Sequence, residues 1–98
     1  MKRFTLTPAA RADLAEIWRY TADRWSEEQA ERYTSEIIDA CDDLAAHRRR
    51  GRSIDDVRRG YFKLAVGTHF LIHRLTPGDN VDIVRILHQR MDVADRLQ

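Results

Sequence analysis

The chain has 98 residues, of which 17 are Lys or Arg, 16 are Asp or Glu, and 43% are hydrophobic. Such a chain can build one modest hydrophobic core, so we expect a single domain over residues 1–98 and exclude a disordered protein. No apolar run is long enough to cross a bilayer and no signal-like segment is present, so we expect a cytoplasmic protein without a membrane partner. The lone Cys41 cannot form an internal disulfide and is expected to be buried and inert.

The N-terminal part predicts a strand followed by a helix. Residues 2–6 alternate polar and apolar side chains, which is typical of a short strand. Thr7 and Pro8 then form a helix start, with Thr7 as the N-cap and Pro8 at the first helical position. The predicted helix has one apolar stripe, formed by Ala10, Leu14, Ile17, Trp18, Thr21 and Trp25.

A second helix follows almost directly. Ser26 and Gln29 form a capping-box pattern, and the helix is expected to end near His47. Because the join is so short, the two helices must form an antiparallel hairpin. The apolar stripe of the second helix contains Ala30, Tyr33, Ile37, Ala40, Cys41 and Leu44.

The remaining chain predicts three strands. The first covers residues 57–65, and the other two flank a turn at residues 76–80 that contains Pro-Gly. The expected fold is a two-layer α+β domain of order β-α-α-β-β-β. Its four-stranded antiparallel sheet has the order 1-4-3-2, with the helical hairpin on one face. Residues 2–6 and 57–65 would be the edge strands, and the second face would be open and basic, with Arg74 and Arg85 on it.

The last strand carries the most suggestive chemistry. His88 ends that strand, and Arg74 and Arg85 are expected on the same sheet. An imidazole among guanidinium groups suits acid–base attack on a phosphodiester, although an ordinary polar strand end fits equally well. The four histidines have no metal-ligand spacing, and no cofactor motif is present, so we expect neither metal nor cofactor.

Two further features suggest binding surfaces. Residues 48–50 and Arg52 form an arginine cluster that could contact phosphate, although basic residues also suit a solvated helix end. Tyr20 and Ile38 lie off the two helical stripes and widen the apolar surface of the hairpin. Such a surface suits an amphipathic partner helix.

Four motifs resemble the ParE branch of the ParE/RelE toxin superfamily. They are residues 4–14 with Ile17 and Trp18, residues 28–30 with Tyr33, residues 51–52, and residues 84–92. The closing Arg-x-Leu-His-x-Arg-Met-Asp pattern, residues 85–92, is the most specific. The resemblance runs nearly end to end, and the fold of these toxins agrees with the β-α-α-β-β-β order.

The resemblance implies the toxin of a type II toxin–antitoxin module. ParE-like members trap DNA gyrase on cleaved DNA, and this hypothesis implies a non-enzymatic inhibitor that binds its target through Arg85, His88, Arg90 and Met91. RelE-like members cut messenger RNA on the ribosome, which would make Arg74, Arg85 and His88 catalytic. The lysine-rich strand of such nucleases is absent here. A non-toxic relic that only binds its antitoxin is a third possibility.

The resemblance also implies a partner. We expect a ParD-like antitoxin whose disordered tail folds on binding, and contact with operator DNA only through that antitoxin. A helix of the antitoxin would bury Tyr20 and Ile38, and an extended segment would pair with a sheet edge.

Overall fold

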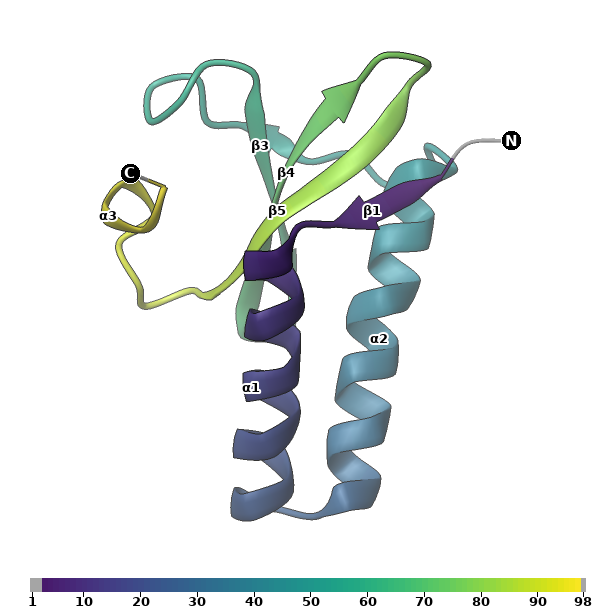
Figure 1. The fold of residues 1–98 in the computed structure, drawn as a ribbon, viewed down its shortest axis with the longest axis vertical. Coiled ribbons are helices and arrows are strands. Elements are labelled where there is room, and N and C mark those ends of the chain that lie inside the picture. The colour runs from purple at the N-terminus through teal and green to yellow at the C-terminus, as the bar shows by residue number, and fades with distance from the viewer. Residues whose placement is uncertain (1–2, 98) are drawn as a thin grey trace.

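The computed structural model describes residues 3–97, so residue 2 of the predicted first strand lies outside the described residues. The chain forms three helices and five strands within that range (Figure 1). No helix within residues 3–97 has the length and apolar character needed to span a bilayer. In chain order the elements are β1 Phe4–Leu6, α1 Pro8–Arg24, α2 Glu27–Ala45, β2 Arg52–Ser53, β3 Tyr61–Val66, β4 His69–Thr76, β5 Asn80–His88 and α3 Val93–Arg96.

Both predicted helix starts are confirmed. The hydroxyl of Thr7 accepts the backbone N–H of Ala10 at 3.1 Å, with Pro8 as the first residue of α1. The hydroxyl of Ser26 accepts the N–H of Gln29 at 3.0 Å and begins α2. These side chains satisfy backbone donors that a helix leaves free at its first turn, which is why the caps fix where each helix begins.

The predicted sheet is wrong in two respects. The sheet has five strands in the order β1-β5-β4-β3-β2, and it is mixed, because β1 pairs with β5 in parallel. Thr7 is the only residue between β1 and α1, so the chain cannot reverse there and α1 leads away from the sheet (Figure 1). The expected connector contributes the short edge strand β2, and β3 begins only at Tyr61, after a turn.

The main core lies between the helical hairpin and one face of the sheet. It includes Ile37 and Cys41 of α2 and Leu71 and Ile83 of the sheet, all inaccessible to solvent. Burial raises the pKa of Cys41 to about 12, so the thiol is inert at neutral pH, as predicted. The far end of the hairpin extends past the sheet (Figure 1).

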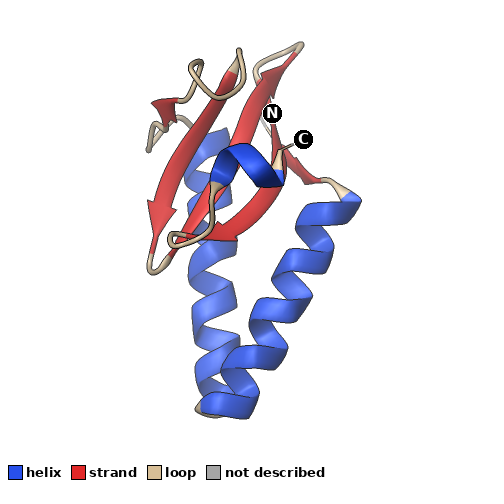
Figure 2. Cartoon of the chain, turned by 90° about the vertical axis from the view of Figure 1, so that its left-hand side faces the viewer, coloured by secondary structure: helices blue, strands red, loops and turns tan. Residues whose placement is uncertain are grey.

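The second face of the sheet is not open, contrary to the prediction. Ile54 of the β2–β3 connection and Leu97 after α3 pack there against Ile72 and Leu87. Figure 2 shows α3 in front of the sheet and α2 behind it. The helix α3 was not predicted from the sequence, because its four residues are too few to show a helical period.

Candidate functional site

A β-bulge determines where Arg85 points. Ile72 of β4 pairs with Arg85, while the next residue, His73, pairs with Ile83, so Val84 is an extra residue in β5. Bulges bend a strand and redirect its side chains. Val81 and Ile83, before the bulge, pack in the core under the helices, whereas Arg85 lies opposite Ile72, which packs on the second face of the sheet. The guanidinium of Arg85 reaches Asp13 of α1 and also donates to the carbonyl of Arg96 at 3.2 Å.

Asp13 of α1 and Arg85 form an ion pair with two hydrogen bonds. The Nε–Oδ2 distance is 2.8 Å and the Nη2–Oδ1 distance is 3.0 Å, and both side chains are largely buried. These hydrogen bonds raise the pKa of Arg85 above its ordinary value. Asp13 Oδ2 also accepts the backbone N–H of Ile86 at 2.9 Å. Arg85 is therefore held in place and does not form part of an open basic face.

The three residues of the predicted nuclease site do not converge. Arg74 forms an ion pair with Asp82 at 3.0 Å. His88 pairs across the sheet with His69, which lies five positions from Arg74 along β4. At the usual rise of a strand, that separation is roughly 17 Å. One phosphodiester could not contact both Arg74 and His88.

The phenol of Tyr33 organises the polar residues where β4 begins. It accepts the backbone N–H of Thr68 at 3.1 Å, and its oxygen lies 2.6 Å from Nδ1 of His69. The ring packs against Gly67, whose φ of +56° and lack of a side chain both suit this turn. Tyr33 packs against the main core, as predicted, and its half-buried hydroxyl also forms these hydrogen bonds.

Two histidines complete this polar cluster. The rings of His69 and His88 meet edge to face with centroids 5.2 Å apart. Burial lowers the pKa of His69 to about 4, helped by the neighbouring His88, so His69 is neutral at physiological pH. Nδ1 of His88 accepts the backbone N–H of Arg90 at 3.1 Å. Within residues 3–97, no three His, Cys, Asp or Glu side chains lie close enough to hold a metal ion.

These residues line a concavity of about 740 Å³, here called the histidine groove. Aromatic and apolar side chains from α1 and the C-terminal segment form its walls. Three of them, Tyr20, Trp25 and Met91, are among the exposed large apolar side chains of the described chain. The exposed fraction of Trp25 is 67%, so its predicted place in the core is wrong. Its lining residues include Asp13, Tyr20, Trp25, Tyr33, His69, Arg85, His88 and Met91.

The histidine groove brings together three of the four residues predicted to bind a target. Arg85, His88 and Met91 all line it. Arg90 is exposed just beyond β5 and does not line the groove, although its backbone supports His88.

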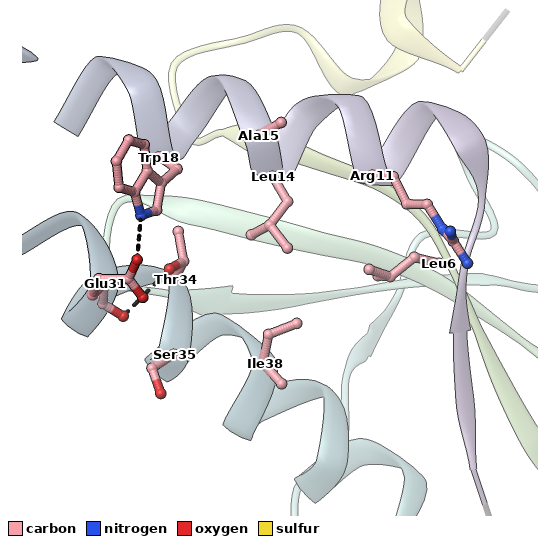
Figure 3. A pocket seen from close by; sticks show the side chains of 9 residues that line it. All are labelled: Leu6, Arg11, Leu14, Ala15, Trp18, Glu31, Thr34, Ser35 and Ile38. Atoms are coloured by element: carbon pink, nitrogen blue, oxygen red, sulfur yellow. Dashed lines mark hydrogen bonds between the residues drawn. The ribbon is translucent and has the colours of Figure 1, made fainter. Parts of the chain in front are cut away.

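A second concavity, here called the helix groove, lies between α1 and α2. Its volume is about 530 Å³, and Leu14, Trp18 and Ile38 line it with six other residues (Figure 3). The indole N–H of Trp18 donates to Glu31 at 3.1 Å. Tyr20 follows Trp18 by two positions, about 200° around the helix, and lines the histidine groove instead. Tyr20 and Ile38, the residues predicted to bind the antitoxin, therefore line two different grooves.

Asp13 and Tyr33 are the site residues that the sequence analysis missed. Asp13 follows Ala10 by three residues and precedes Ile17 by four, so it lies on the stripe that faces the sheet. A carboxylate on a buried stripe requires a partner, so the position of Asp13 in the sequence could have indicated a paired carboxylate at the sheet.

Comparison with known proteins gives the family. Residues 4–93 match the family described as ParE toxin of type II toxin-antitoxin system, parDE. Toxin ParE1 of Mycobacterium tuberculosis is 52% identical over 95 residues, which cover 97% of both chains. Toxin ParE1 of Caulobacter vibrioides is 37% identical over 97 residues, which cover 99% of both.

Solved structures agree on the fold. A chain of the chromosomal ParDE TA system from P. aeruginosa aligns with a TM-score of 0.74 and 24% identity, over 90% of this chain and 95% of that one. A chain of the toxin–antitoxin complex RelBE2 from Mycobacterium tuberculosis aligns with a TM-score of 0.64 and 25% identity. The alignment covers 89% of this chain and 96% of that one. With a family match over residues 4–93 and a full-length relative at 52% identity, the chain belongs to the ParE toxin family of type II toxin–antitoxin systems.

Proposed function

We propose that this toxin inhibits DNA gyrase without being an enzyme, and that the histidine groove is its contact with gyrase. The gyrase target follows from the resemblance to the ParE branch. The observation that carries the groove assignment is the convergence of Tyr20, Trp25 and Met91, all exposed, around one concavity. Exposed aromatic and thioether side chains around a concavity are typical of the few residues that dominate binding energy.

The floor of the groove supports this proposal because it is already ordered. Asp13 holds Arg85, and Tyr33 holds His69, through contacts within the chain itself. A partner would meet a surface whose side chains lose little freedom on binding, which favours affinity.

The ribonuclease alternative has less support. It would need Arg74, Arg85 and His88 at one phosphate, whereas both arginines are paired with carboxylates and Arg74 is roughly 17 Å from His88 along the sheet.

We also propose that a ParD-like antitoxin neutralises the chain with a tail that folds on binding. The two similar solved structures are described as toxin–antitoxin systems, which supports such a partner. The helix groove would take an amphipathic helix against Ile38. A separate segment would have to cover Tyr20, and in doing so it would occupy the histidine groove and exclude the target.

The test uses purified toxin with gyrase and supercoiled plasmid. We expect cleaved DNA to accumulate with toxin concentration. Unimpeded supercoiling at a large molar excess of toxin would refute the gyrase proposal. A parallel reaction with translating ribosomes tests the alternative, because new 5′ ends in the message would identify a nuclease.

A further inference from the structure

We propose that this chain itself binds the phosphate backbone of duplex DNA, through Arg49, Arg50, Arg52 and Lys63, here called the basic edge. The inference goes beyond the gyrase target, because it concerns a direct contact between toxin and DNA and can be tested without gyrase. It departs from the expectation that the chain meets operator DNA only through its antitoxin. Neither the histidine groove nor the helix groove includes these residues.

Positive charge is concentrated in this part of the chain. Seven of the 17 Lys and Arg residues, but only two of the 16 Asp and Glu residues, lie in residues 48–63. The formal net charge of the whole chain is only +1, so the rest of the molecule is net acidic. A separated basic region attracts a polyanion even when the total charge is near zero.

The sheet places these charges side by side. Arg52 of β2 faces Lys63 of β3 directly across the antiparallel ladder. The guanidinium of Arg49 donates to the carbonyl of Ala65 at 3.4 Å, two residues further along β3. Like charges directly opposite each other destabilise a sheet, so this arrangement has a cost in the free chain that a bridging phosphate would remove.

Carboxylates do not neutralise the basic edge. Within residues 3–97, none of its four residues forms an ion pair. The two acidic residues of the segment, Asp55 and Asp56, lie in the turn before β3, where Asp55 accepts the N–H of Gly60 at 2.9 Å. These four cations are therefore available to an external anion.

The neighbouring aromatic rings favour duplex DNA over single strands. Tyr61 is buried, with the guanidinium groups of Arg58 and Arg74 5.1 Å and 6.0 Å from its ring centroid. The Nζ of Lys63 lies 4.6 Å from the ring centroid of Phe70. Proteins that bind single strands stack bases on exposed rings. Here cations lie over the rings of Tyr61 and Phe70, and the ring of Phe62 stacks on that of His73. A surface of cations without free rings suits backbone phosphates.

An acidic protein segment fits the basic edge less well. Protein interfaces depend on buried aromatic or apolar anchors in addition to charge. The exposed large apolar side chains of the described chain are Tyr20, Trp25, Val57, Leu75 and Met91, and none belongs to the basic edge.

The experiment compares two triple variants of the full chain that carry the same change in charge. One replaces Arg50, Arg52 and Lys63 by Gln in the basic edge. The other replaces Arg11, Arg19 and Arg24 by Gln; all three are exposed on α1. Fluorescence anisotropy with a labelled duplex of about 20 base pairs, at about 50 mM salt, reports binding without gyrase.

We expect the basic-edge variant to bind at least about tenfold more weakly than the unsubstituted chain. The slope of log affinity against log salt concentration should be smaller in magnitude by about 2 to 3 than that of the unsubstituted chain, because three phosphate contacts are lost. The α1 variant should bind within about twofold of the unsubstituted chain. Two results would overturn the proposal. Equal losses of DNA affinity in both variants would mean that only net charge matters. If the unsubstituted chain does not bind the duplex at all, the basic edge serves only to protect an edge strand from aggregation.

Two controls keep the result decisive. Removing the repulsion between Arg52 and Lys63 should leave the midpoint of thermal unfolding unchanged or higher. If the triple variant nevertheless fails to fold, the single variant Arg52→Gln should lose about threefold to tenfold in affinity and reduce the salt slope by about one.

Single-stranded RNA and a poly-glutamate peptide serve as competitors. Displacement of the duplex by either, at equal charge concentration and as effectively as by unlabelled duplex, would contradict the assignment to duplex DNA.

Discussion

The guanidinium of Arg85 and the carboxylate of Asp13 form a two-point ion pair that fastens helix α1 to the edge of β5. Two further contacts support the same junction. Asp13 accepts the N–H of Ile86, and the hydroxyl of Thr7 donates to the carbonyl of Val84 at 2.7 Å. The side chains of Thr7, the N-cap of α1, and of Asp13 thus bond to the backbone of β5 where its pairing with β1 ends. The histidine groove opens beside this junction.

Substituting Asp13→Ala should reduce the free energy of unfolding by about 2 to 3 kcal/mol. The change removes the carboxylate beside a partly buried guanidinium, which keeps only its bond to the carbonyl of Arg96, and leaves the N–H of Ile86 without its acceptor. Glu28→Ala is the control, since Glu28 and Arg32 form an exposed pair one helical turn apart. That control should cost less than about 0.5 kcal/mol. Urea unfolding measures the stability of both variants. Equal losses in the free energy of unfolding would show that the Asp13–Arg85 pair does not stabilise the fold.

His69 gives a prediction about pH. Its folded pKa of about 4 lies below the ordinary value of 6.5, so the unfolded chain binds the proton more readily. The stability that His69 contributes is therefore complete above pH 6.5 and is lost as the pH falls toward 4. His73, whose pKa burial also lowers, acts in the same direction.

The variant His69→Asn isolates this effect. Asn keeps an acceptor for the hydroxyl of Tyr33 but does not titrate in this range. Free energies of unfolding measured from pH 7 to pH 4 should fall less steeply in the variant than in the unsubstituted chain. Parallel curves would contradict the lowered pKa of His69.

Ile38→Asp should weaken antitoxin binding by roughly 1 to 3 kcal/mol, because a carboxylate would replace an apolar contact in the helix groove. Leu75→Asp is the matched control, since Leu75 is exposed at the end of β4 and lines neither groove. Isothermal titration calorimetry with the cognate antitoxin measures both, with circular dichroism to show that each variant is folded. Unchanged affinity of the Ile38 variant would place the antitoxin elsewhere.

Local rules of the sequence predicted the two long helices, α1 and α2, and the last hairpin well. Thr7 and Ser26 begin the helices because a cap depends only on residues within one turn. The pairing of β1 depends instead on the direction in which α1 leaves it, which the sequence pattern does not contain. The strand β2 has two residues, too few to show an alternation.

The candidate site was predictable only in part. Arg85, His88 and Met91 are close in sequence, so their proximity followed from one segment. Asp13 and Tyr33 come from the helices, and their distances to β4 and β5 depend on how the layers pack. The bulge at Val84 also escaped prediction, because β5 is apolar on both faces and has no clear alternation from which to detect an extra residue.

The most direct test of the account measures how much toxin is needed for half-maximal gyrase-dependent DNA cleavage, in the unsubstituted chain and in two variants. Trp25→Ala removes an anchor of the histidine groove, and Leu75→Ala removes another exposed apolar side chain, which lies outside it. We predict that the Trp25 variant needs at least about tenfold more toxin, as expected for a residue that dominates binding, while the Leu75 variant matches the unsubstituted chain. Equal potency of all three proteins, or no cleavage with any of them, would contradict the account.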